Sequence, residues 1–351
     1  MWLKVRALCK RNKLEMKKTV NLLLLFALTL FSFSCTGKSK YHFDEGQVFH
    51  TYYHIKYECD KSLKDTIVAE LDKFNSSLNP FLKNSVIDKV NNNVDVEVDS
   101  FFKEVFVCAR QISENTDGMF DITCAPLVNL WGFGFENFER VDSAAVDSLL
   151  QFVGYQRISM SPEGHVLKDD QRIKLNMSAI AKGYAVDVVC RLLERFGVKN
   201  YMCEIGGEVR TLGVNPAGES WNIGINKPVD DNTGTISELQ IVLALQGKSI
   251  ATSGDYRNFY YGADGKKYAH TINPKTGYPA EQNILSATVI ADDCMTADAY
   301  ATAFMTMGLE NTISFLEQNP NILAYLIFRD NDGRLAEYCS DSAKNLIVNR
   351  K

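Results

Sequence analysis

Asp298 and Thr302 are the two residues whose types and spacing point most directly to chemistry. They lie four apart in MTADAYATAFMTMG (residues 295–308), a stretch that predicts a buried helix. Residues four apart share one face of a helix, and a carboxylate beside a hydroxyl offers two hard oxygen ligands suited to Mg²⁺. The alternative is structural: Asp298 caps a neighbouring strand, and Thr302 hydrogen-bonds the backbone of its own helix.

Three further segments carry candidate groups, each with a structural alternative. His270 lies on a predicted strand and could act as a general base or bind phosphate, unless it is structural. Lys182, followed by Gly183, lies near a predicted helix start, where an anion would be favoured if the lysine is not simply solvated. Asp121, in GMFDITCAPLVNLWGFG (118–134), suits a loop that grips a planar ring or one that crosses the core.

Several familiar catalytic motifs do not occur in the sequence. It contains no G-x-x-x-x-G-K-[ST] and no G-x-G-x-x-G after a strand, so neither a P-loop nor a Rossmann site is supported. It also lacks the G-x-S-x-G elbow of α/β-hydrolases and the H-E-x-x-H of zinc proteases.

Helices and strands that would position these groups alternate without a βαβ rhythm. Apolar periodicity and end signals predict helices at 62–78, 99–118, 143–153, 178–197, 295–308 and 309–318. Strands or hairpins are predicted at 50–58, 155–175, 239–246, 253–274, 285–291, 322–328 and 334–339. This order favours an α+β fold, with mixed or antiparallel sheets and packed helices.

The N-terminal segment is typical of a targeting signal. Residues 16–35, MKKTVNLLLLFALTLFSFSC, have a basic start, an apolar run too short for a comfortable membrane span, and a cysteine. We interpret 1–35 as a bacterial lipoprotein signal segment in which Cys35 receives the lipid, or alternatively as an uncleaved anchor. We expect a tether at 36–46, a single domain at 47–345 that could contain two subdomains, and a body that faces the periplasm from a lipid anchor in the cell envelope.

Charge and cysteine content narrow the class of protein. Residues 1–20 carry a net charge of +6, so the remainder of the chain carries −11, which argues against nucleic acid as a partner. The seven cysteines beyond Cys35 are scattered and include no C-x-x-C pair, so we expect neither a disulfide framework nor a zinc site.

Taken together, the sequence segments resemble the FAD:protein FMN transferase family, the ApbE-type flavin transferases, from about residue 47 to about residue 310. The resemblance rests on seven blocks in the family's order: SSLNPFLKNSVIDKVN, GMFDITCAPLVNLWGFG, NMSAIAKGYAVD, EIGGEVRTLG, ATSGDYRNFY, HTINPKTGYP and ADAYATAFMTMG. It implies an ApbE-like fold and an enzyme that uses Mg²⁺ to move the FMN half of FAD onto a Thr or Ser hydroxyl of a partner protein, releasing AMP.

The resemblance also implies roles for individual residues. Asp298, Thr302 and the backbone carbonyl of Ala179 correspond to the family's metal ligands. The implied flavin contacts are Phe81, Met119, Phe120, Asp121, Asn176, Lys182 and Ile272, with Phe49 as a further match in a divergent segment. For the base that activates the acceptor hydroxyl we expect His270 or Asp298, and the sequence does not choose between them.

Some residues depart from the family's usual pattern. Asn176 and Asn273 stand where the family usually has Asp, which replaces a charged contact by a neutral one. Phe81 is typical of the transferases, whereas a polar residue there accompanies an FAD pyrophosphatase in one branch. The alternatives to a transferase are therefore a metal-dependent pyrophosphatase that yields FMN and AMP, or a flavin-binding lipoprotein without turnover. The implied partner is a membrane-linked electron-transfer subunit or a secreted flavoprotein.

Overall fold

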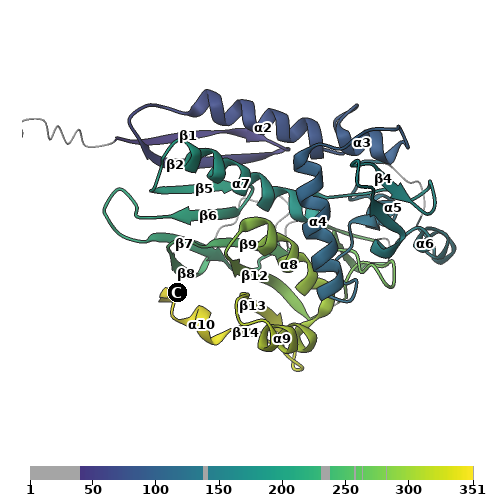
Figure 1. Ribbon diagram of the computed structural model, residues 1–351. Coiled ribbons are helices and arrows are strands. Elements are labelled where there is room, and N and C mark those ends of the chain that lie inside the picture. Colours follow the sequence, from purple (N-terminus) through teal and green to yellow (C-terminus); the bar gives the residue numbers. More distant parts are fainter. Residues whose placement is uncertain are drawn as a thin grey trace, which may run out of the picture. The chain divides into compact units, whose positions relative to one another are not determined.

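An eight-stranded sheet organises the fold, as Figure 1 shows, in the strand order β1-β2-β5-β6-β9-β12-β13-β14. Neighbouring strands from β2 to β14 are antiparallel. The strands are β1 (Lys40–Val48), β2 (Thr51–Cys59), β5 (Tyr201–Ile205), β6 (Glu208–Leu212), β9 (Ser249–Gly254), β12 (Ile284–Ala291), β13 (Leu323–Arg329) and β14 (Leu335–Cys339).

The structure is a computed structural model that describes residues 40–136, 141–230, 238–256, 258–262, 264–281 and 283–350. The predicted signal segment at 1–35, with Cys35, therefore lies outside the described residues. Tyr41–Lys351 form one compact unit. Within the described ranges, no helix combines the length and the apolar composition that a membrane crossing requires.

Three smaller antiparallel sheets accompany the large one. They are formed by β3 (Ile158–Met160) with β4 (Val166–Lys168), by β10 (Phe259–Tyr261) with β11 (Lys267–Ala269), and by β7 (Trp221–Asn226) and β15 (Ile347–Arg350) on either side of β8 (Leu239–Leu245). The predicted α+β class with antiparallel sheets and packed helices is confirmed.

Helices α7 and α8 pack directly on the large sheet, α7 against β5 and β6 and α8 against β9 and β12. Helices α2 and α4 in turn contact α7 and α8 (Figure 1). The helices are α2 (Lys64–Leu78), α3 (Val86–Asn91), α4 (Ser100–Asn115), α5 (Ala125–Leu130), α6 (Ser143–Leu150), α7 (Ser178–Arg195), α8 (Cys294–Met307), α9 (Leu309–Gln318) and α10 (Asp341–Lys344), with short 3₁₀ turns η1 (Ile122–Cys124) and η2 (Tyr155–Arg157).

Both faces of the large sheet are buried. Because side chains alternate along a strand, Ala287 and Val289 of β12 join the core beneath the helices, whereas Ile290 joins a second core. That second core includes Leu243 of β8, so the sheet β15-β8-β7 covers the face opposite the helices. Asp293 fixes the start of α8 by accepting a hydrogen bond from the Thr296 amide at 2.8 Å.

The predicted tether at 36–46 is wrong over residues 40–46, which belong to strand β1. Its composition, KYHFDEGQV, is too polar to stand out as a strand. The strand is held by pairing at the sheet edge and by a buried contact in which the Tyr57 hydroxyl donates to Asp44 Oδ2 at 2.7 Å. The ordered body therefore begins earlier than residue 47.

Candidate functional site

A cavity of about 560 Å³ lies where α7, α8, β6 and β9 meet the segments around residues 119–124 and 270–274. This volume is in the range of about 300–1,000 Å³ that is usual for small-molecule sites. Apart from Phe49, the residues that the sequence analysis assigned to the site line this cavity: Phe81, Met119, Phe120, Asp121, Asn176, Ala179, Lys182, His270, Ile272, Asp298 and Thr302. Their chemical roles stay predictions.

Asp298 is a buried carboxylate that ties α8 to α7. It is only 3% exposed, and its Oδ2 accepts a hydrogen bond from the Gly183 amide at 2.9 Å. Burial raises the Asp298 pKa, and the nearby ammonium of Lys182 opposes that rise. In a regular α-helix the amide of residue 183 points at the carbonyl of residue 179. A backbone carbonyl oxygen has two lone pairs, so the Ala179 carbonyl keeps capacity for another partner.

Thr302 lies one turn further along α8, on the same face as Asp298. Its Oγ1 lies 3.1 Å from the Ser253 Oγ of β9, and both residues line the cavity. Over the described parts of the chain, no three side chains of His, Cys, Asp or Glu gather as a metal-binding group. A cation here would therefore draw on Asp298 together with hydroxyl and carbonyl oxygens. This donor set fits Mg²⁺, which takes oxygen ligands and keeps part of its octahedron for water or phosphate.

Glu208 is a site residue that the sequence reasoning missed. The Lys182 Nζ of α7 lies 2.6 Å from the Glu208 Oε1 of β6, and the Glu208 side chain is 2% exposed. Burial by itself would lower the Lys182 pKa, but the carboxylates of Glu208 and Asp298 more than offset this effect, so Lys182 stays protonated. The second oxygen of Glu208, Oε2, is buried and has no hydrogen-bond partner among the described residues. The cavity thus contains a fixed positive charge and an available acceptor.

His270 lines the same cavity and has one ring nitrogen without a hydrogen-bond partner among the described residues. This nitrogen, Nδ1, is buried. Burial, reinforced by the positive charge of Lys182, lowers the His270 pKa to about 4. The imidazole is therefore neutral at pH 7 and can accept a proton.

The replacement His270→Gln should flatten the loss of stability on acidification. An unfolded histidine has a pKa near 6.5, so below that pH the unfolded chain binds a proton that the folded chain refuses until about pH 4. The contribution of neutral His270 to the free energy of unfolding is fully present above about pH 6.5. It is lost as the pH falls towards 4, with a slope of at most about 1.4 kcal/mol per pH unit. Thermal unfolding midpoints from pH 7 to about pH 4 check this; parallel curves for both proteins would contradict it.

The 119–124 segment is held by hydrogen bonds within it and to neighbouring segments. Both carboxylate oxygens of Asp121 already accept: Oδ1 from the Thr123 amide at 2.7 Å and Oδ2 from the Tyr155 amide at 2.7 Å. Phe120 is only 2% exposed and belongs to the core. Asp121 and Phe120 thus line the cavity chiefly as supports for the loop.

The two asparagines that depart from the family pattern both organise backbone turns. Asn176 Oδ1 accepts from the Ser178 amide at 2.9 Å and so prepares the start of α7. Asn273 Oδ1 accepts from the Lys275 amide at 2.9 Å within the turn that follows Ile272. An amide oxygen performs this task as well as a carboxylate oxygen would.

Apolar groups form another part of the cavity wall. Phe81 is 53% exposed, and its ring contacts those of His50 and Phe135 edge-on, at centroid distances of 5.9 Å and 6.0 Å. Ile272 is 6% exposed and packs in a small cluster with Trp131. Phe49, the further flavin match from the sequence, is not part of this wall; its ring packs 5.2 Å from that of Phe74 instead.

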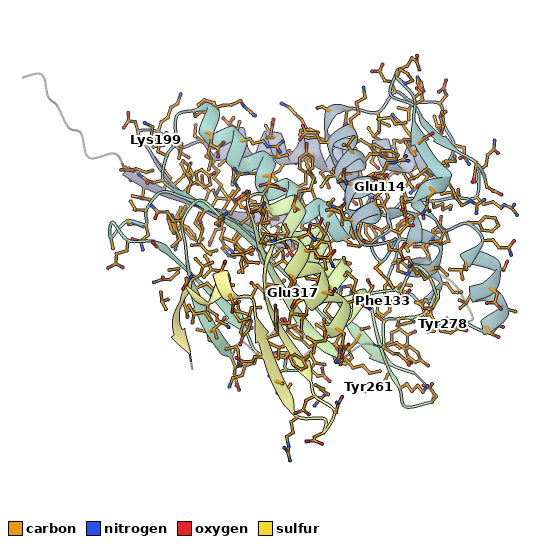
Figure 2. All side chains as sticks on the ribbon, turned by 60° about the horizontal axis from the view of Figure 1, so that its bottom comes forward. Glu114, Phe133, Lys199, Tyr261, Tyr278 and Glu317 are labelled. Carbon is orange, nitrogen blue, oxygen red and sulfur yellow. The ribbon has the colours of Figure 1, made fainter. Side chains whose placement is uncertain are left out.

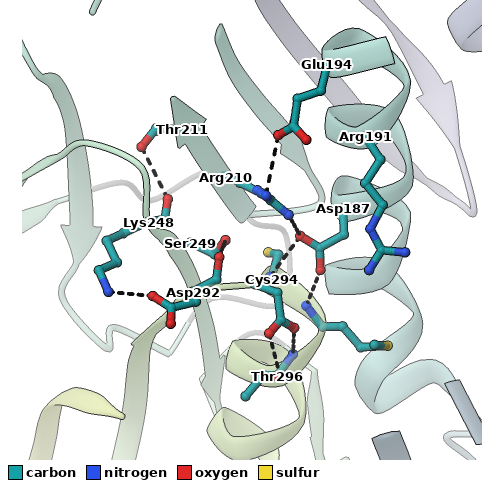
Figure 3. Close-up of polar contacts among 12 residues, drawn as sticks. Asp187, Arg191, Glu194, Arg210, Thr211, Lys248, Ser249, Asp292, Cys294 and Thr296 are labelled. Carbon is teal, nitrogen blue, oxygen red and sulfur yellow. Dashed lines mark hydrogen bonds and ion pairs between the residues drawn. The ribbon is translucent and has the colours of Figure 1, made fainter. Parts of the chain in front are cut away.

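A second buried network fixes the position of α8 relative to α7 and β6, as Figure 3 shows. The carboxylate of Asp187 on α7 accepts from the amides of Cys294 and Met295, at 3.0 Å and 2.8 Å, at the first turn of α8. The Arg210 guanidinium of β6 donates to the same carboxylate at 2.8 Å. Asp187 lies outside the cavity wall, so it positions Asp298 without facing the site itself.

Comparison with known proteins identifies a family. Residues 49–327 match the model of the ApbE family. The chain is 34% identical over 336 residues to the FAD:protein FMN transferase of Haemophilus influenzae. This alignment covers 91% of this chain and 95% of the relative. It is 35% identical over 341 residues to the protein of that name from Vibrio cholerae, covering 93% and 99%.

Solved structures agree with the sequence comparisons. The flavin transferase ApbE from Vibrio cholerae superposes with a TM-score of 0.78 at 33% identity, over 88% of this chain and 99% of that one. The Pseudomonas stutzeri flavinyl transferase ApbE in its apo form gives a TM-score of 0.77 at 28% identity, over 89% and 98% of the two chains.

Proposed function

The chain belongs to the ApbE family, and from this premise we propose that it transfers the FMN half of FAD to a Thr or Ser hydroxyl of a partner protein and releases AMP. One observation carries this proposal: a single cavity joins an apolar wall around Phe81 and Ile272 to a charged wall around Lys182 and Asp298. FAD has the same division, since a planar apolar ring system is linked to an anionic diphosphate.

The charged wall suits the diphosphate. Lys182 lies in the first turns of α7, where the helix dipole adds to the positive charge of its ammonium and favours an anion. Asp298, Thr302 and the Ala179 carbonyl supply oxygen donors for Mg²⁺ on the adjoining wall. When bound there, Mg²⁺ would neutralise charge that builds up on the phosphoryl oxygens during transfer.

The proposed reaction is a displacement at phosphorus. The oxygen of the acceptor hydroxyl forms a bond to the phosphorus of the FMN half, the bond from that phosphorus to the bridging oxygen breaks, and AMP leaves with the electron pair. The hydroxyl proton needs an acceptor. Asp298 already accepts a hydrogen bond from the Gly183 amide and is assigned to the cation. We therefore assign this task to His270, whose imidazole is neutral at pH 7 and whose Nδ1 has no partner among the described residues.

Two assays test the proposal together. Incubation with FAD and Mg²⁺, followed by measurement of AMP, separates an enzyme from a non-catalytic flavin binder. Addition of a candidate acceptor, drawn from membrane-linked electron-transfer subunits, should give a fluorescent flavin band that survives denaturation. AMP without that band, on an acceptor that the Vibrio cholerae relative flavinylates in parallel, would favour a pyrophosphatase.

Thr302→Ala should slow transfer about tenfold and raise the Mg²⁺ concentration needed for half-maximal rate. The effect is moderate because a water molecule can replace one neutral oxygen ligand, and a change of about 1.4 kcal/mol corresponds to tenfold. Steady-state rates across a Mg²⁺ titration measure it. Thr302→Ser keeps the hydroxyl and should restore activity; a serine variant as slow as the alanine variant would contradict a ligand role.

Anchoring in the cell envelope is proposed from the N-terminal sequence alone. A lipid on Cys35 would tether the body at the membrane and bring it close to membrane-linked acceptors. Metabolic labelling with a radioactive fatty acid tests this: the protein should be labelled, and Cys35→Ala should remove the label. Equal labelling of both proteins would refute the assignment.

A further inference from the structure

An exposed group of aromatic rings continues outward from the cavity. We call it the aromatic surface and define it as Phe133, Tyr260, Tyr268 and Tyr278, packed around Trp131. Phe133 lines the cavity, and its ring centroid lies 5.5 Å from that of Tyr260, which in turn lies 5.5 Å from that of Tyr268. Trp131 joins Tyr268 to Tyr278, with centroid distances of 5.2 Å and 5.7 Å.

The outer rings of this surface remain accessible. Tyr260 is 37% exposed and Tyr278 is 41% exposed, whereas Trp131 beneath them is 6% exposed. Figure 2 shows Phe133 and Tyr278 in the same part of the molecule. Half-exposed tyrosines combine an apolar ring with a polar tip, a combination that is enriched where proteins bind one another.

Hydrogen bonds hold the aromatic surface in place. The Trp131 indole N–H donates to the Gly277 carbonyl at 2.8 Å, and the Tyr268 hydroxyl donates to Asp264 Oδ2 at 2.7 Å. A surface that is already ordered loses little conformational entropy when a partner settles on it. These contacts therefore favour binding over a purely internal packing role.

We propose that the acceptor protein docks on the aromatic surface and from there directs its Thr or Ser hydroxyl into the cavity. This inference rests on the function proposed above. A folded acceptor cannot enter a cavity of about 560 Å³, so its body must rest on the rim while only the hydroxyl-bearing segment reaches inside. Phe133 belongs to both the cavity wall and the aromatic surface, because it lines the cavity and its ring packs against that of Tyr260.

The charges nearby favour a polypeptide over a membrane as the occupant. Lys267 on β11 is paired with Asp230 at 2.5 Å and lies 3.7 Å from Asp255. Its positive charge is therefore offset. Among the described residues of this hairpin (258–262 and 264–269), Lys266 is the one other Lys or Arg, which is fewer than the cluster of about four to eight basic residues that attracts anionic lipid headgroups. The aromatic surface also lies beside the cavity, where the body of the acceptor must rest while its hydroxyl reaches inside. Binding to a membrane would not require this position.

The test compares the double variant Tyr260→Ala, Tyr278→Ala with the control Tyr261→Ala. Tyr261 is 61% exposed on the same strand, but successive residues of a strand point to opposite faces, and its ring packs against Phe259. For each protein we would measure the KM for the acceptor protein used in the transfer assay, kcat, the dissociation constant of FAD from flavin fluorescence, and the thermal unfolding midpoint.

The double variant should raise the KM for the acceptor about tenfold or more, because buried aromatic anchors dominate most interfaces, with kcat and FAD affinity unchanged. Tyr261→Ala should match the wild type. An unchanged KM in the double variant, or an equal rise in Tyr261→Ala, would overturn the inference. A parallel loss of FAD affinity would assign the rings to the nucleotide instead.

Two further outcomes keep the inference separate from its premise. If the double variant keeps its KM but loses cosedimentation with vesicles of phosphatidylcholine and phosphatidylserine, the aromatic surface contacts membranes and the inference is wrong. If the wild-type protein modifies no acceptor that the Vibrio cholerae relative modifies, the proposed function itself fails, and the docking inference falls with it.

Discussion

Asp298→Asn should leave a folded protein whose flavin transfer is slower by about a thousandfold or more. The asparagine Oδ1 can still accept the hydrogen bond that the Gly183 amide now donates to Asp298 Oδ2 at 2.9 Å, so the contact between α7 and α8 persists. The negative charge disappears, however, and with it the only carboxylate in the proposed ligand set of Asp298, Thr302 and the Ala179 carbonyl. Loss of a metal's charge stabilisation amounts to several kcal/mol of the barrier, and each 1.36 kcal/mol is tenfold in rate.

Asp298→Ala provides the stricter version of this experiment. It removes both the charge and the acceptor for Gly183, so transfer should be abolished while the fold survives with a lower unfolding midpoint. Rates of covalent flavin transfer, Mg²⁺ binding by isothermal titration calorimetry and thermal unfolding measure the three effects. Full activity of either variant at limiting Mg²⁺ would refute the metal assignment.

Gly183→Ala should both destabilise the protein and abolish most of its activity. A Cβ at position 183 would lie 2.2 Å from the Cys294 carbonyl oxygen and 2.7 Å from the Asp298 Cβ. Helix propensity alone favours alanine over glycine by up to about 1 kcal/mol, but relief of this clash requires α7 and α8 to separate, and such overpacking typically costs about 1–3 kcal/mol. The separation would also move Asp298 away from the Ala179 carbonyl.

The direction in which Gly183→Ala shifts the thermal unfolding midpoint tests this close packing of α7 and α8. An ordinary helical glycine replaced by alanine raises the unfolding midpoint, whereas Gly183→Ala should lower it and reduce transfer at least tenfold. Arg195→Ala on the same helix removes only an exposed contact to Glu70 at 3.2 Å and should leave both quantities near wild type. A stabilised and active Gly183→Ala protein would show that the two helices do not need this close approach.

Local sequence patterns predicted the helices of the site well. The four-residue spacing of Asp298 and Thr302 predicted a shared helical face, and both residues do lie on α8 and line one cavity. The polar strand β1 was missed because its hydrogen bonds depend on the sheet edge that it joins. Helix α5, with a proline in its first turn, was hidden within a segment rich in glycine and aromatic residues that read as a loop.

Contacts between distant segments could not be predicted from the sequence. Glu208 begins β6 directly after a turn of two glycines, and only the packing of β6 against α7 brings its carboxylate to Lys182. Asp187 gives no local sign that it will accept hydrogen bonds from the first turn of α8, more than a hundred residues away. Phe120 lines the cavity, but the sequence could not show that its ring is almost wholly buried.

The proposed flavin transfer can be tested by mass spectrometry of a purified acceptor protein that has been incubated with this protein, FAD and Mg²⁺. The acceptor should gain one FMN on a Thr or Ser for each AMP released, and EDTA should abolish both products. Release of AMP without any mass gain, on an acceptor that the Vibrio cholerae relative modifies under the same conditions, would contradict the transferase account.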